Sequence, residues 1–119
     1  MQPRLGDESS LQKRVDEWVD KVLPDDKDPV LRAMRFLEEA TELCQAAGLS
    51  QAQAQKTMKM VYSKPPGEIH QELGGVQTTL CALATALDWD LETVTKVELE
   101  RMWRKAETIQ QKNRSKPRP

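Results

Sequence analysis

Residues 28–48 read DPVLRAMRFLEEATELCQAAG, and this stretch decides the fold. Asp28 can cap a helix, and Pro29 suits the first helical position because the N–H that proline lacks would be unpaired there anyway. Gly48 is typical of the residue just past a helix end. The stretch therefore predicts one long helix that starts at Pro29 and ends near Gly48.

Four further helices are predicted around this one from apolar residues at helical spacing. Their ranges are about 9–23, about 50–62 with Ser50 as cap, about 68–87, and 90 to beyond 109 with Asp90 as cap. The chain is interrupted at Pro24-Asp25-Asp26 and Pro65-Pro66-Gly67, because proline cannot continue a helix. No stretch has the two-residue alternation of a strand. The predicted fold class is all-α: an antiparallel helical bundle of four to five helices, oligomeric.

The chain has 119 residues, of which 38% are hydrophobic, and a mean hydropathy of −0.69. This length suffices for one modest core, so we expect a single all-α domain over residues 1–112 and a basic, disordered tail over 113–119. The lean apolar content predicts that another copy covers some apolar surface, as in a homodimer or tetramer. No apolar run could span a membrane, and MQPRLGDESS is unlike a secretory signal, so the expected location is the cytoplasm.

The net charge of −1 hides an uneven distribution. Residues 1–100 carry a balance of −7, whereas residues 101–119 carry +6. A basic end next to an acidic body can attract phosphates or dock on the body itself. With five aromatic residues and no interleaving of basic and aromatic positions, nucleic-acid binding is poorly supported.

Three glutamates of the helix predicted to start at Pro29 fall within an arc of about 100°: Glu38, Glu39 and Glu42. A solvated face is the plain interpretation of such a string. A carboxylate on another helix favours a metal site instead. Glu72 lies beside the apolar arc of the helix predicted over 68–87 and needs a partner there. Ligands that are all oxygen suit a hard cation such as Mg²⁺ or Mn²⁺, and such ions favour phosphate substrates.

Gly74 and Gly75 stand together inside a predicted helix, where each glycine costs about 1 kcal/mol relative to alanine. Two explanations remain open. Either another helix packs closely against the glycines, or a ligand lies against the bare backbone.

The ordered series FLEEATELCQ, SKPPG, QELGGV and ELERMWRK resembles the MazG-like family of all-α nucleoside triphosphate pyrophosphohydrolases, in particular its small phage and prophage branch. The resemblance covers roughly residues 30–112. The ExxE motif of the family corresponds to Glu39 and Glu42, and the glutamate of its ExxD motif corresponds to Glu72. Gly75 stands at the expected aspartate position, for which Glu38 and Glu68 are the nearest replacements.

This resemblance implies hydrolysis between the α- and β-phosphates of a nucleoside triphosphate, with purine deoxynucleotides (dGTP, dATP) favoured. Glu39, Glu42 and Glu72 would hold Mg²⁺ or Mn²⁺, with Glu38 and Glu39 as catalytic residues that prepare the attacking water. Lys64, Arg101 and Lys105 are candidates for binding the substrate phosphates. The alternative for the late basic residues is ion pairing within their helix, for example between Glu98 and Arg101.

Two rival functions remain open at this point. The chain could be a non-catalytic helical interaction protein, in which Gly75 marks a decayed metal site. Less favoured is a nucleic-acid-binding accessory protein that works through residues 101–119.

Overall fold

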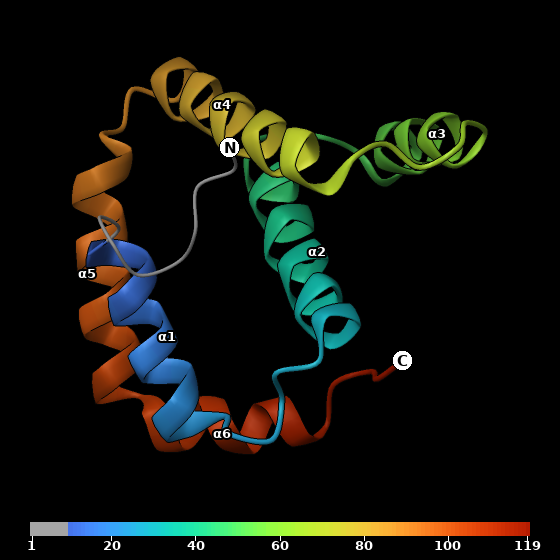
Figure 1. Ribbon diagram of the computed structural model, residues 1–119. Coiled ribbons are helices and arrows are strands. Elements are labelled where there is room, and N and C mark those ends of the chain that lie inside the picture. Colours follow the sequence, from blue (N-terminus) through green and yellow to red (C-terminus); the bar gives the residue numbers. More distant parts are fainter. Residues whose placement is uncertain (1–9) are drawn as a thin grey trace. The chain divides into compact units, whose positions relative to one another are not determined.

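The computed structural model describes residues 10–119, and these residues form six helices and no strand (Figure 1). The helices are α1 (Ser10–Val22), α2 (Pro29–Ala46), α3 (Gln51–Tyr62), α4 (Ile69–Ala86), α5 (Leu91–Arg104) and α6 (Ala106–Arg114). The predicted all-α class is confirmed for this part of the chain. Ser9, the expected start of the first helix, lies outside the described residues, as do nearly all the residues on which the absence of a secretory signal was argued.

The helix termini confirm several predicted signals. The Asp28 carboxylate accepts a hydrogen bond from the Leu31 N–H at 3.0 Å, as an N-cap does, and Pro29 is the first residue of α2. Gly48, just past the end of α2, has a φ of 103°, a conformation that favours glycine. At the start of α3, Ser50 and Gln53 exchange both hydrogen bonds of a capping box.

The predicted number of helices is wrong, because the predicted fifth helix is two helices in the structure. Lys105, with φ −105° and ψ 18°, separates α5 from α6. In a continuous helix the Met102 carbonyl would accept the N–H four residues later. Here that carbonyl accepts the indole N–H of Trp18 at 3.0 Å. The interruption is thus associated with a tertiary contact, and no glycine or proline marks it in the sequence.

The contacts of the chain divide it into two compact units. The first contains described residues 10–35 and 92–119. Its core is formed by Trp18, Val22 and Leu23, and side chains from α1, α5 and α6 pack against this core: Val19, Met102, Ala106 and Ile109. The Gln110 side chain also donates a hydrogen bond to the Val22 carbonyl at 2.9 Å, which ties α6 to the end of α1.

The second unit, Phe36–Leu91, has a different character. None of its side chains is buried, although α4 carries a full apolar stripe. Ile69 is 80% exposed and Leu73 is 68% exposed. In a single chain these apolar side chains face water, whereas folded proteins normally cover such large patches.

No helix in the described part of the chain combines the length and apolar character that crossing a membrane requires. Residues 113–119, expected as a disordered tail, begin inside α6 with Asn113 and Arg114. Arg118 within the same segment pairs with Asp26. The single domain over residues 1–112 and the antiparallel bundle stay predictions.

Candidate functional site

The central helix α2 brings three of the predicted acids together. Glu38 is half-buried, and Glu39 and Glu42 are exposed on the same stretch of α2. Helical geometry fixes their shared arc, because residues three or four positions apart project from the same face. The arc thus places three carboxylates on one face of α2.

Glu72 lies in the first turn of α4 and is exposed. Its side chain folds back over Gly67, so that a Cβ added at Gly67 would lie 2.8 Å from Glu72 Oε2. The N-terminus of α4 carries a positive partial charge, which stabilises a carboxylate there. Gly67, the last residue of the Pro-Pro-Gly interruption, thus leaves the space that the Glu72 carboxylate occupies.

We expect Gly67→Ala to displace the Glu72 carboxylate with little effect on stability. Gly67 does not have a positive φ, and the new methyl would meet only the end of a flexible side chain. The free energy of unfolding should therefore change by no more than about 0.5 kcal/mol. Any stabilisation by Mn²⁺ in a thermal melt should decrease. An undiminished Mn²⁺ effect in this variant, with Glu72→Gln measured beside it, would show that the Glu72 position does not matter for metal binding.

Within one chain, Glu72 does not join Glu39 and Glu42 in a cluster of metal-binding size. Among residues 10–119, no group of three or more His, Cys, Asp or Glu residues is placed to hold a metal ion. The carboxylate oxygens fit a hard cation by their chemistry. Their arrangement in a single chain does not complete a three-carboxylate site.

Gly74 and Gly75 have an open face. A Cβ added at either glycine would meet no atom of the described chain within 4 Å, apart from their own helix backbone and immediate neighbours. Thr78 and Thr79 donate hydrogen bonds to the carbonyls of these glycines at 2.9–3.1 Å, an arrangement common for threonine inside helices. Close packing by another helix of the same chain, one of the two open explanations, is not observed in the part of the chain described.

The predicted phosphate-binding residues are exposed but differ in their partners. Arg101 donates two hydrogen bonds to the Glu98 carboxylate, at 2.8 and 2.7 Å, and this interaction lowers the pKa of Glu98. The helix-internal ion pair considered for Arg101 is therefore present. Lys64 lies in the loop after α3, and Lys105 lies at the junction of α5 and α6.

A second polar cluster, around Asp26, was not predicted from the sequence. Asp26 is only 7% exposed, and its carboxylate accepts hydrogen bonds from Arg118 at 2.9 Å and from Asn113. Arg35 of α2 donates to the Asn113 side chain and to the Pro117 carbonyl, both at 2.9 Å. The charge imbalance predicts a basic end that can dock on the acidic body. The choice of Asp26 as acceptor became visible only in the structure.

The surroundings of Asp26 favour its ionised form. The hydrogen bond from Arg118 lowers the pKa of Asp26, burial opposes this effect, and Asn113 and the charge of Arg32 lower the pKa further. The pKa of Arg32 is itself lowered by burial and by the nearby charges of Arg35 and Arg118, against the favourable charge of Asp26. Positive charge is therefore in excess around this carboxylate.

The lowered pKa of Asp26 predicts how its contribution to stability depends on pH. A carboxyl group whose pKa is lower in the folded state stabilises the fold above its unfolded-state value, about 3.9, and loses that contribution as pH falls through the folded value. Asp26→Asn should therefore be less stable than the wild type at pH 7, and the difference should shrink below about pH 4. Urea unfolding of both proteins from pH 7 to pH 2.5 measures this difference. A gap that stayed constant over this range would contradict the assignment.

Comparisons of this chain with known protein families, with curated proteins and with solved structures found no match. Its function is therefore inferred from its own residues, their geometry and the motif resemblance.

Proposed function

We propose that this chain is a metal-dependent nucleoside triphosphate pyrophosphohydrolase of the MazG-like type. It would act in the cytoplasm and convert a nucleoside triphosphate and water into a monophosphate and pyrophosphate, with dGTP and dATP as preferred substrates. The observation that carries the proposal is the glutamate arc of α2, Glu38, Glu39 and Glu42, followed in order by the Gly67 interruption and Glu72. The cation is Mg²⁺ or Mn²⁺, since its ligands would be carboxylate oxygens.

Each glutamate has a proposed role that suits its position. Glu39, Glu42 and Glu72 are the ligands of the cation, which when bound would offset negative charge on the phosphate oxygens. Glu38 is half-buried next to this group and would accept a proton from the attacking water, with Glu39 assisting. Lys64, Arg101 and Lys105 are exposed cations proposed to neutralise the triphosphate.

Self-association is a necessary part of this proposal, because one chain does not assemble the three ligands. Large apolar residues along α4 and at its C-cap are spaced alternately by four and three: Ile69, Leu73, Val76, Leu80, Leu83 and Leu87. This spacing is typical of a helix that packs along another helix. The exposure of Leu73 and the open face of Gly74 and Gly75 support a second copy as the missing neighbour. We propose a homodimer or tetramer in which this copy completes the site beside Glu72.

Leu73→Glu should therefore convert the oligomer into monomers of 13.6 kDa. A charge in the middle of an apolar helix interface has no partner and costs several kcal/mol to bury. Light scattering on size-exclusion fractions gives the mass. Gln71→Glu is the matched control, because it adds the same charge on the opposite side of α4 and should leave the mass unchanged. A wild-type chain that is monomeric at micromolar concentration would refute the proposed assembly.

The activity itself is tested with a panel of nucleoside and deoxynucleoside triphosphates in the presence of Mg²⁺ or Mn²⁺. We expect pyrophosphate and the monophosphate as products, fastest with dGTP and dATP, and no turnover in EDTA. Release of orthophosphate alone would point away from attack at the α-phosphorus. Absence of turnover with every nucleotide and both metals would reject the enzyme.

Two observations favour a second candidate, a non-catalytic helical interaction protein. Gly75 stands where the motif has a metal ligand, and residues 10–119 of one chain hold no cluster of three candidate ligands. This candidate predicts that neither Mn²⁺ nor Mg²⁺ raises the melting temperature, with or without nucleotide. An enzyme predicts a rise that nucleotide increases, because binding to the folded state alone stabilises it.

A further inference from the structure

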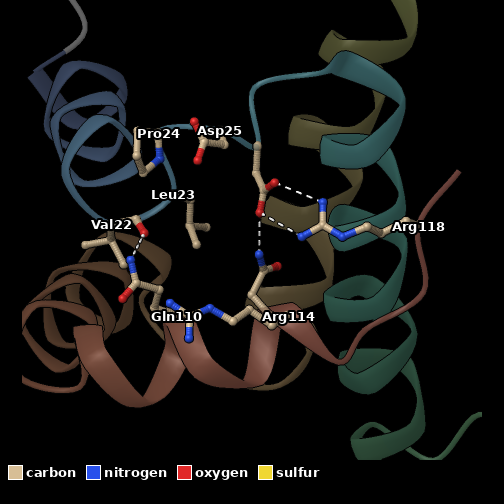
Figure 2. Close-up of a pocket in the computed structure, with 9 residues that line it drawn as sticks. Val22, Leu23, Pro24, Asp25, Gln110, Arg114 and Arg118 are labelled. Atoms are coloured by element: carbon tan, nitrogen blue, oxygen red, sulfur yellow. Dashed lines mark hydrogen bonds and ion pairs between the residues drawn. The ribbon is translucent and has the colours of Figure 1, made fainter.

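A cavity of about 190 Å³ lies beside the Asp26 cluster, where the loop after α1 meets α6 and the C-terminal residues (Figure 2). Every residue that lines it belongs to the unit of residues 10–35 and 92–119. The charged residues that line it are Asp25, Asp26, Arg114 and Arg118. None of these residues belongs to the proposed catalytic site.

Positive charge exceeds negative charge around this cavity. Arg118 pairs with Asp26, and Arg32 is close enough for its charge to act on the same carboxylate. Arg35 reaches the cluster through Asn113, and Arg114 lines the cavity from α6. Arg114 and Arg118 line the cavity itself, whereas Arg32 and Arg35 join the same cluster through Asp26 and Asn113. Four arginines and two aspartates therefore gather in this region, and the surplus of positive charge favours an anion.

Hydrogen-bond donors are also in surplus. Three guanidinium nitrogens, Arg32 Nε, Arg32 Nη2 and Arg35 Nη2, are buried without a hydrogen-bond partner in the described chain. Arginine stays protonated in proteins, so these groups cannot lose their charge to escape the penalty. A cluster with more donors than acceptors is suited to an added acceptor with several oxygen atoms.

The size of the cavity restricts that acceptor. A water molecule takes up about 30 Å³, so the space corresponds to about six waters. Pockets for drug-sized ligands begin at about 300 Å³, so this space is small for a whole nucleotide. A tetrahedral phosphate with a few waters fits, and guanidinium groups bind phosphate oxygens through paired N–H donors.

We propose that the arginine cluster of Arg32, Arg35, Arg114 and Arg118 binds a phosphate group, either as inorganic phosphate or as one end of pyrophosphate. Arg118, near the chain end and half-exposed, turns from Asp26 to the anion, while Asn113 keeps its hydrogen bond to Asp26. In this arrangement Asp26 is a built-in counter-ion that competes with the ligand. The proposal does not depend on the hydrolase activity.

The test is calorimetric titration of the full-length chain with inorganic phosphate and, separately, with pyrophosphate. EDTA is present throughout, so neither binding to a metal nor turnover contributes. Sodium chloride at equal ionic strength is the control for screening of surface charge. We expect saturable binding of at least one of the two anions and none of chloride, and the comparison identifies the preferred source of the phosphate group.

Substitutions then locate the site. Arg118→Gln and Arg32→Gln should each weaken binding about tenfold or more, because each removes charge-assisted hydrogen bonds. Arg14→Gln, an exposed arginine of α1, is the matched control and should bind as the wild type does. Asp26→Asn keeps every arginine and should bind more tightly, because it removes the competing charge. Equal heats for phosphate and chloride, or affinities unchanged in both arginine variants, would overturn the proposal.

Discussion

Glu42→Gln is expected to lower kcat/KM for the preferred deoxynucleotide by about 100-fold or more. Loss of a group that only supports a metal ligand typically costs about 10- to 100-fold, and loss of a ligand should cost at least as much. Glutamine keeps the size of the side chain and removes its charge. Since Glu42 is exposed on α2, the helical circular dichroism and the melting temperature without metal should stay close to those of the wild type.

A matched control for this substitution is Glu17→Gln on α1, also exposed and outside the proposed site. It changes the net charge by the same amount and should retain full activity. Measuring Mn²⁺ binding in parallel separates loss of the metal from loss of chemistry. A Glu42→Gln enzyme that turns over normally would remove Glu42 from the site and, with it, the ExxE assignment.

Replacement of Trp18 is expected to cause a large loss of stability. This side chain is 3% exposed, lies in the core with Val22 and Leu23, and donates its indole N–H to the Met102 carbonyl. Trp18→Ala is expected to lower the free energy of unfolding by about 3–5 kcal/mol, through lost burial and the cavity that remains. That is a large share of the roughly 5–15 kcal/mol by which native proteins are stable. Urea unfolding followed by circular dichroism measures it.

Two further variants separate the causes of this loss. Trp18→Phe keeps a buried ring but removes the N–H, so it should cost less than the alanine variant, with about 0.5–1.5 kcal/mol from the lost hydrogen bond. Trp103→Ala, at a position that is 44% exposed, should cost clearly less than Trp18→Ala. Equal losses at positions 18 and 103 would show that the core of this unit is not centred on Trp18.

The acidic arc of α2 was predictable because a helix alone fixes the angle between residues three or four positions apart. The position of Glu72 relative to that arc was not predictable in the same way. It depends on packing between helices, and in unit Phe36–Leu91 no side chain of one chain is buried to fix such packing. Only the motif resemblance linked Glu72 to Glu39 and Glu42, because local helix geometry does not relate residues on different helices.

The Asp26 cluster was likewise predictable only in part. Composition indicated a basic end and an acidic body, yet the first 100 residues hold many carboxylates that could have received Arg118. Asp26 lies 92 positions before Arg118 and becomes its partner because α6 packs on the end of α1. Neither residue belongs to a motif, so no local signal could have selected the pair.

The sequence by itself determined the all-α class and most of the helix ends, since caps, prolines and apolar spacing act within one turn of the chain. Asp28, Ser50 and Gly48 confirm this in the structure. Only the tertiary structure decided the break at Lys105 and the arginine cluster around Asp26. Both depend on hydrogen bonds between residues more than 80 positions apart in sequence, Trp18 with the Met102 carbonyl and Asp26 with Arg118. Such contacts form through packing, which no local preference encodes.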